Sequence, residues 1–319
     1  MKKKTVFAIL VLTSIILTFG ISKIYKQNFD IIHNQEDNNH QKDFNLHFRS
    51  YTLIKPDSVC FAGEYAPIYA EDIWERYDKE IHKNVYWQSN TMFYFKRANK
   101  YFPIIEPILL KNNIPNDFKY LAVIESGLEN VVSPSGAAGF WQFMKGTAQD
   151  YKLEVNSEVD ERYNLEKSTQ AACEYLNKAY DKFGNWTMAA ASYNVGMYGL
   201  DNKTTEQMTS NYYNLYLNDE TSRYIFRLLA VKEIFENKKK YGFHIREKDL
   251  YKPIQMKKVE LKQSNVNLSE FSNSLGINYK ILKQLNPWLR SQTLINKNQK
   301  KYIINIPFST NDINIFNNY

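Results

Sequence analysis

The sequence of 319 residues has few of the side chains that hold metals or form crosslinks, with 2 Cys and 5 His. Cys60 and Cys173 are far apart in the chain and show no metal-ligand spacing. The histidines form no pair at helical spacing. We therefore expect no metal and no other cofactor. Whether the two cysteines pair in an oxidising compartment, or are each a buried thiol, is open at this stage.

Acidic residues are scarce near the C-terminus. Residues 237–302 hold 15 Lys and Arg against 4 Asp and Glu, a net charge of +11, so the rest of the chain carries −4 of the total of +7. A basic segment attracts anionic partners such as a cell-wall polymer, a membrane surface or nucleic acid, and a solvated surface explains it equally well. We expect no nucleic-acid binding, because the segment has no recognisable reading motif.

A long apolar run stands at the N-terminus. Three lysines follow Met1, the segment 5–21 carries no charge, and Lys23 and Lys26 come next. The run is long for a cleaved signal, and no clear small-x-small cleavage site or nearby cysteine follows it. The pattern favours an uncleaved membrane anchor over residues 1–26, with the rest on the periplasmic side of the cell envelope. A cleaved signal is the open alternative.

The remainder is typical of a mainly α protein with a small C-terminal module. Gln27 to Arg49 is polar and predicts a flexible linker. Patterning predicts helices over 117–125, over 166–183 ending at Gly184, over 186–194 ended by Gly196 and Gly199, and a last helix capped by Asp219. Pro103 and Pro107 predict breaks or short segments. The tail predicts a β-α-α-β unit from 259–261, 268–275, 279–285 and 302–306, with Gly276 between the helices. The expected domains are an N-terminal helical extension (50–103), a main helical domain (104–240), a linker (241–255), the module (256–308) and a tail (309–319).

One predicted helix carries a carboxylic acid on an apolar face. Phe118, Leu121, Ala122 and Glu125 follow one another at i, i+3, i+4 and i+7 and therefore share a face. A carboxylate at the end of a core-facing stripe is partly desolvated, which raises its pKa. A raised pKa suits a general acid near neutral pH. Taken alone, the pattern favours a helix whose last carboxylate points into water, because one Glu on an apolar face is a weak signal.

Four motifs in order carry a more specific signal. They are Glu125-Ser126-Gly127-Leu128, Ser133 through Gly139-Phe140-Trp141-Gln142, Ala191-Ser192-Tyr193-Asn194-Val195-Gly196, and Glu220-Thr221-Ser222-Arg223-Tyr224-Ile225. Together they resemble the lytic transglycosylases that cut bacterial peptidoglycan, most of all the membrane-bound lytic murein transglycosylase D group. The resemblance covers roughly residues 104–238. Ser192, where the family often has Ala, is a small-for-small departure.

This resemblance implies a goose-type-lysozyme-like fold with a cleft for a glycan strand. It implies that Glu125 is the single catalytic acid/base, which cleaves the MurNAc-GlcNAc β-1,4 bond without water and leaves 1,6-anhydroMurNAc ends. It implies substrate-binding roles for seven more residues. Ser126 and Ser133 would contact the sugar or hold the Glu125 side chain, Gln142 would meet the N-acetyl group, and the others that line the site are Tyr193, Asn194, Glu220 and Tyr224. Gly136 and Gly139 would let the backbone approach a helix or the sugar closely. A hydrolytic muramidase on the same fold, or a non-catalytic peptidoglycan-binding protein, are the alternatives.

The tail resembles a LysM module, a small domain that binds N-acetylglucosamine-containing chains. Gly276-Ile277 and Leu285-Asn286-Pro287 carry the likeness. The usual Gly-Asp-Thr-Leu start is replaced by Asn265-Val266-Asn267-Leu268, so the match is partial. The resemblance implies a LysM-like fold. Whether the module binds glycan or only packs on its neighbour is open from sequence.

Overall fold

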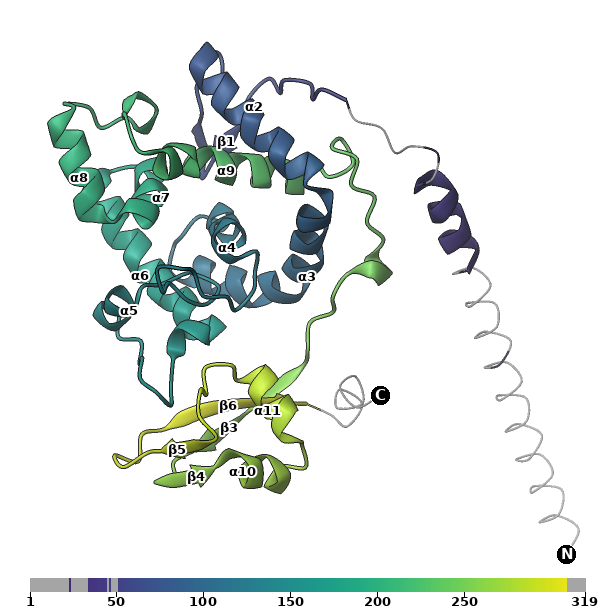
Figure 1. Ribbon diagram of the computed structural model, residues 1–319, viewed down its shortest axis with the longest axis vertical. Coiled ribbons are helices and arrows are strands. Elements are labelled where there is room, and N and C mark those ends of the chain that lie inside the picture. Colours follow the sequence, from purple (N-terminus) through teal and green to yellow (C-terminus); the bar gives the residue numbers. More distant parts are fainter. Residues whose placement is uncertain (1–22, 24–33, 45, 47–50, 309–319) are drawn as a thin grey trace, which may run out of the picture. The chain divides into compact units, whose positions relative to one another are not determined.

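A computed structural model describes residues 23, 34–44, 46 and 51–308 (Figure 1). The chain divides into two compact units, 1–52 and 53–319. In the first unit, residues 34–44 are helical, whereas their polar composition predicted a flexible segment. The predicted anchor falls almost wholly outside the described residues. Within the described part of the chain, none of the helices is both long enough and apolar enough to span a membrane.

Most of the second unit is a helical domain, as predicted. In Figure 1 helix α4 lies inside a ring formed by α3, α6, α7 and α9. The α-helices are α2 (Glu71–Tyr86), α3 (Gln88–Lys111), α4 (Lys119–Ser126), α5 (Lys145–Asp150), α6 (Leu165–Phe183), α7 (Trp186–Val195), α8 (Met197–Glu206) and α9 (Asp219–Glu236). Short 3-10 turns η1 (Asn116–Phe118), η2 (Glu161–Tyr163), η3 (Tyr212–Asn214) and η4 (Glu247–Asp249), and a hairpin of β1 (Cys60–Phe61) and β2 (Glu64–Tyr65), complete the domain.

Helix α3 runs through both prolines that were predicted to break it. Each proline removes a backbone donor and crowds the preceding turn, at a cost of about 3 kcal/mol. Burial offsets this cost, because Ile105 and Leu109 have no exposed surface and Phe95 packs its ring 4.3 Å from that of Phe235 in α9. Each such side chain gains about 1.5–3 kcal/mol on burial. Tertiary packing therefore overrides the local signal.

The predicted helix ends are partly confirmed. Gly184 ends α6 with φ of 74°, and Gly196 ends α7 with φ of 81°. Gly199, however, lies within α8 and ends nothing, so that prediction was wrong. The cap of α9 is Asn218, whose Oδ1 accepts a hydrogen bond from the N–H of Thr221, and not Asp219. Asp219 is the first residue of the helix, where a carboxylate interacts favourably with the helix dipole.

The C-terminal module contains the predicted β-α-α-β order and two further strands. Its elements are β3 (Met256–Leu261), β4 (Asn265–Asn267), α10 (Leu268–Ser274), α11 (Tyr279–Leu285), β5 (Thr293–Ile295) and β6 (Tyr302–Pro307). β3 and β6 pair antiparallel from Met256 with Pro307 to Leu261 with Tyr302, and β4 pairs with β5. The β4–β5 pair was missed because three-residue strands give almost no periodicity.

The two cysteines are free thiols. Burial raises the pKa of the Cys173 thiol to about 12, which keeps it protonated and unreactive. Cys60 lies beside Lys232, whose Nζ donates to the Cys60 carbonyl at 3.0 Å.

Candidate active site

A cleft of about 760 Å³ opens at the C-terminal end of α4. Six elements supply its walls: the end of α4, the loop 133–144 (the cleft loop), α5, α6, the end of α7, and the first turns of α9. Seven of the eight predicted site residues line it. The lining residues are Ile124, Glu125, Ser133, Pro134, Ser135, Ala137, Gln142, Phe143, Met144, Thr147, Tyr175, Tyr193, Asn194, Val195, Gly196, Glu220, Tyr224 and Arg227.

Glu125 sits at the end of a buried stripe, as the periodicity predicted. Phe118, Leu121 and Ala122 have no exposed surface, and Glu125 follows them with its side chain half-buried at the cleft. Gly127, with φ of 63°, ends the helix just beyond it. Burial raises the pKa of the Glu125 carboxyl from 4.5 to about 7, and the negative charge of Glu220 adds to the rise. A group with that pKa is present in both protonation states near pH 7.

Two side chains of α9 oppose this rise. The hydroxyl of Tyr224 donates a hydrogen bond to Oε1 of Glu125, and the positive charge of Arg227 also lowers the pKa. Tyr224 is 1% exposed, and burial together with the charge of Glu125 holds its own pKa well above 10. The phenol therefore stays protonated and acts as a fixed donor. Arg227 is held by a hydrogen bond from its Nη2 to the Ile124 carbonyl at 2.6 Å.

Gln142 is held in an unusual backbone conformation. Its φ is 48°, which is uncommon for a residue with a side chain. Its Nε2 donates to the carbonyls of Gly139 at 2.7 Å and Val131 at 3.1 Å. Both side-chain hydrogen bonds of Gln142 are made by Nε2, and its Oε1 accepts none from the described residues. Gln142 lines the cleft, so this acceptor is available to a ligand there.

Tyr193 and Asn194 connect the cleft loop with α9. The Tyr193 hydroxyl donates to the carbonyl of Trp141 at 2.8 Å and not to Glu125. Burial and the nearby charge of Glu125 raise its pKa well above 10. Asn194 donates from Nδ2 to Glu220 at 3.3 Å and accepts at Oδ1 from Thr221 at 2.8 Å. The amide is thereby fixed between α7 and α9.

Ser126 and Ser133 form their hydrogen bonds with backbone groups. Ser133 lines the cleft, and its Oγ accepts from the N–H of Ala137 at 3.0 Å, which closes the turn at the start of the cleft loop. Ser126 is the one predicted site residue that does not line the cleft. Its hydroxyl lies within hydrogen-bonding distance of the carbonyls of Ala122, at 3.1 Å, and Phe140, at 2.8 Å. It therefore ties the helix of Glu125 to the cleft loop.

Sequence reasoning missed residues that position the site. Arg227 lies three residues after Tyr224 and seven after Glu220, so it shares their face of α9, and that spacing could have identified it. Arg162 gave no sequence signal. Its Nη1 donates to the carbonyls of Gly136 at 2.9 Å and Phe143 at 3.1 Å, in the cleft loop.

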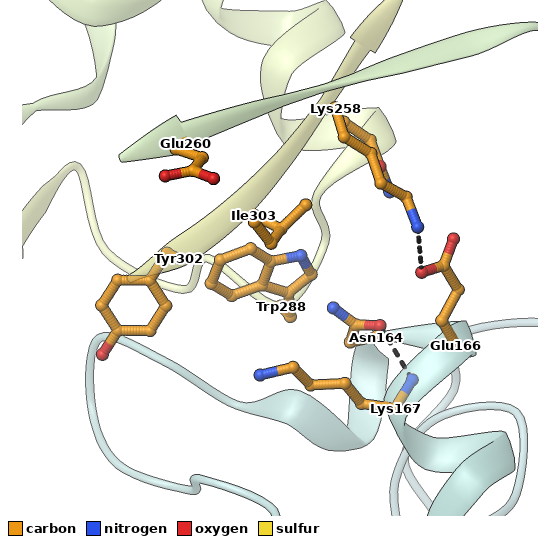
Figure 2. A pocket seen from close by; sticks show the side chains of 9 residues that line it. Asn164, Glu166, Lys167, Lys258, Glu260, Trp288, Tyr302 and Ile303 are labelled. Atoms are coloured by element: carbon orange, nitrogen blue, oxygen red, sulfur yellow. Dashed lines mark hydrogen bonds and ion pairs between the residues drawn. The ribbon is translucent and has the colours of Figure 1, made fainter. Parts of the chain in front are cut away.

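A smaller hollow of about 240 Å³ lies between the start of α6 and the strands β3 and β6 (Figure 2). Figure 2 shows Trp288 at its centre, stacked near Tyr302, with Lys258 paired to Glu166 at 2.7 Å. The indole Nε1 of Trp288 is buried and has no partner among the described residues. Within that same part of the chain, no group of three His, Cys, Asp or Glu side chains is placed to hold a metal ion.

Comparison with known proteins agrees with the motifs. Residues 103–216 match the family model of the Transglycosylase SLT domain. This part of the chain is therefore a transglycosylase SLT domain. Residues 257–310 match the model of the Soluble lytic transglycosylase C-terminal LysM-like domain, so the predicted LysM-like module is confirmed. The SLT match ends before α9, which supplies Tyr224 and Arg227 to the cleft.

Curated relatives include membrane-bound lytic murein transglycosylase D of Escherichia coli strain K12, which is 29% identical over 206 residues. The alignment covers 62% of this chain and 44% of that protein, so this chain spans less than half of its relative's length. A putative tributyltin chloride resistance protein of Alteromonas sp. strain M-1 is 31% identical over 124 residues, 38% of this chain and 58% of the relative. Among solved structures, the 70 kDa soluble lytic transglycosylase of E. coli matches 48% of this chain and 27% of its own, with 20% identity and a TM-score of 0.37.

Proposed function

We propose that this protein is a lytic transglycosylase that cleaves the MurNAc-GlcNAc β-1,4 bond of peptidoglycan and leaves 1,6-anhydroMurNAc ends. The observation that carries the proposal is Glu125, a half-buried carboxyl at the cleft whose pKa is raised to about 7. The SLT family match and the homology with a murein transglycosylase support the substrate class.

In the first step, protonated Glu125 gives its proton to the glycosidic oxygen as the bond from C1 of MurNAc breaks. The carbonyl oxygen of the substrate's own 2-acetamido group attacks C1 and forms an oxazolinium-like intermediate. Glu125 is now a carboxylate, and the hydrogen bond from Tyr224 stabilises this charged form. A fixed donor that favours the carboxylate makes the proton easier to release at neutral pH.

In the second step, the Glu125 carboxylate takes the proton of the C6 hydroxyl. The C6 oxygen attacks C1, the oxazolinium ring opens, and the acetamido group is restored. Glu125 returns to its protonated form, so one residue serves first as acid and then as base. No carboxylate nucleophile is needed, which fits a site built around a single acid with a raised pKa.

The remaining cleft residues have roles in binding. Oε1 of Gln142 is suited to accept a hydrogen bond from the N–H of the acetamido group, because its Nε2 is already used by the backbone. Tyr193, Asn194, Glu220 and Ser133 line the walls along which the glycan lies. Ser126 acts indirectly, since it fixes the cleft loop to α4.

Hydrolysis is the second candidate, favoured by one observation. Glu220 is a second carboxylate at the same cleft, and a pair of carboxylates could activate water in place of the C6 hydroxyl. Product mass separates the two reactions, because the anhydro product is lighter than the hydrolytic product by one water. Glu220 is exposed and bonded to Asn194, which favours a binding role.

The test is digestion of purified murein sacculi with the full chain, followed by mass analysis of the released fragments. We expect anhydro-muropeptides from the wild type and none from Glu125→Gln, which keeps the size of the side chain and loses the proton. The variant should bind sacculi as the wild type does. Release at the wild-type rate by the variant would remove Glu125 from the mechanism. Binding without release by the wild type would favour a non-catalytic peptidoglycan-binding protein.

The proposed location follows from the substrate and from the homology with a membrane-bound transglycosylase. We place the protein in the cell envelope, on the periplasmic side of the membrane, held or exported by its apolar N-terminal segment. Its partners are glycan strands of peptidoglycan and, if the segment is retained, the membrane.

A further inference from the structure

The LysM-like module is joined to the helical domain through backbone pairing. The N–H of Asp160 donates to the carbonyl of Trp288 at 2.8 Å, and the N–H of Arg290 donates to the carbonyl of Glu158 at 2.7 Å. These two bonds flank an antiparallel bridge between Val159 and Leu289. The segment 154–164, called here the docking segment, thus forms one more short strand pair with the module.

Buried side chains make the junction part of the module's core. Val159 is 1% exposed and Leu289 is fully buried. Ala138 and Tyr163 of the helical domain belong to the same apolar cluster as the module's core residues. The guanidinium of Arg290 lies 4.2 Å from the ring of Tyr163. Burial of this kind indicates a fixed contact and not a loose tether.

Polar contacts at the edge of the junction converge on Glu154. The hydroxyl of Tyr302 lies 3.1 Å from both carboxylate oxygens, and Lys300 forms an ion pair with Oε2 at 2.5 Å. The backbone N–H of Ile295 donates to Glu158 at 2.6 Å. The ion pair of Lys258 and Glu166, seen in Figure 2, is a further polar contact between the module and the helical domain.

The other side of the docking segment holds the cleft loop. Asp160 binds the guanidinium of Arg162 through both carboxylate oxygens, and Arg162 donates to the carbonyls of Gly136 and Phe143. A Cβ at Gly139 would lie 2.0 Å from the Arg162 carbonyl, so the two backbones are in direct contact. The Arg162 side chain is 11% exposed. Loss of any of its three hydrogen-bond partners would therefore leave a buried donor unsatisfied and lower the stability of the fold.

We infer that the LysM-like module positions the cleft loop, and so the substrate-binding amide of Gln142, by holding the docking segment against it. Tyr302, Arg290 and Val159 are then positioning residues for the reaction at Glu125. The path is short: Leu289 pairs with Val159, Asp160 orients Arg162, and Arg162 fixes both ends of the loop segment 136–143. This inference rests on the proposed function for its activity readout.

The alternative role for such a module is to hold long glycan strands near the cleft, and substrate length separates the two roles. A soluble tetrasaccharide of alternating GlcNAc and MurNAc occupies the cleft and is too short to need a second holding site. A tethering module predicts that damage to the junction leaves turnover of the tetrasaccharide unchanged and raises only KM on sacculi. A positioning module predicts that kcat on the tetrasaccharide falls as well.

Two full-chain variants test the inference. Tyr302→Phe with Arg290→Ala removes the Tyr302 contact with Glu154 and the Arg290 contact with Tyr163 and keeps the backbone bridge. Val159→Asp places a charge in the bridge itself. Tyr279→Phe with Lys280→Ala makes the same kinds of change on α11 and serves as the control. A displacement of about 1 Å in a substrate-positioning group costs up to about a hundredfold in rate. We expect at least about a tenfold loss of kcat for Val159→Asp, a smaller loss for the double variant, and none for the control.

Hydrogen exchange provides a readout that does not depend on activity. The N–H groups of Ala137, Ala138, Gly139 and Gln142 are all bonded within the cleft loop or to its flanks. We expect them to exchange at least about tenfold faster in Val159→Asp, while the amides of α6 keep their protection. If these amides are unchanged, or if α6 loses protection equally, the inference is wrong. If the wild type releases no anhydro-muropeptides from sacculi, the proposed function fails, and the exchange result still decides the positioning role.

Discussion

The hydrogen bond from Tyr224 to Glu125 makes a specific prediction about the pH dependence of cleavage. The phenol donates to the carboxylate, so it favours the charged form and lowers the pKa of Glu125 against the larger effect of burial. Tyr224→Phe removes the donor and keeps the ring. A hydrogen bond to a charged group contributes about 1.5–3 kcal/mol. At 1.36 kcal/mol per pKa unit, the pKa of Glu125 should rise by about one to two units from its value of about 7.

The sign of the effect on activity follows from the first step. Only protonated Glu125 can donate to the glycosidic oxygen, so kcat/KM falls as the pH rises through the pKa of the free enzyme. In the wild type this fall should be centred near pH 7. In Tyr224→Phe it should move to higher pH by the same one to two units. The maximal rate should also drop, because the carboxylate formed in the transition state has lost a donor.

The assay is the initial rate of anhydro-muropeptide release from sacculi, measured across the pH range for the wild type and the variant. Tyr212→Phe is the matched control, because Tyr212 of η3 is also a buried tyrosine packed against α9. Its hydroxyl lies 2.8 Å from the backbone carbonyls of Thr221 and Ser222 and makes no bond to Glu125. We expect the alkaline limb of the pH–rate profile of Tyr212→Phe to coincide with that of the wild type. A Tyr224→Phe profile that overlays the wild type would show that the bond does not set the pKa, and the argument would be refuted.

Three further predictions follow from the same structure. Glu125→Gln should raise the free energy of unfolding by up to about 3 kcal/mol at pH 8 and hardly at all at pH 4. The reason is that the pKa of Glu125 is raised from 4.5 to about 7 in the folded protein, so the wild type loses stability as the pH rises through that interval. Equal effects at both pH values in chemical denaturation would contradict this. Gly139→Ala should lower stability by about 1–3 kcal/mol more than Gly136→Ala, since both have positive φ but only Gly139 faces a backbone at 2.0 Å; thermal melting of the pair measures the difference. Asn218→Ala should lower the free energy of unfolding by about 1 kcal/mol, because Asn218 caps α9. Asp219→Ala should lower it by about half of that or less, because Asp219 interacts only with the helix dipole. The opposite order would show that Asp219 is the cap.

Much of the site could be read from the sequence, because its chemistry is local. The apolar face that ends in Glu125 needs only the helical period, and the structure places that carboxyl at the cleft. Glycines at the ends of α6 and α7 were found because a left-handed residue stops a helix wherever it occurs. The order of the four motifs brought Gln142, Tyr193 and Tyr224 into one prediction. Their roles in binding and catalysis stay predictions until the variants are measured.

Other features could not be read from the sequence because the deciding contact is distant along the chain. Pro103 and Pro107 stay in a helix because that helix is packed against others. The Ser126 hydroxyl faces backbone carbonyls in the structure, and nothing within its own helix could have indicated the Phe140 carbonyl. Arg227 was within reach of a pattern argument, since its spacing from Tyr224 puts both on one face. It was missed because a lone arginine on a helix is usually a surface residue.

The junction between the helical domain and the LysM-like module was beyond sequence reasoning for a further reason. Its central contacts are backbone N–H and C=O groups of residues 158–160 and 288–290, and every residue except proline carries these groups. The sequence left two roles for the module, glycan binding and packing on its neighbour. The Val159–Leu289 bridge packs the module on the helical domain. Arg162, in the same segment as Val159, is hydrogen-bonded to the cleft loop. Packing and function are then not alternatives, because a module that only packs can still set the geometry in which Gln142 meets the substrate.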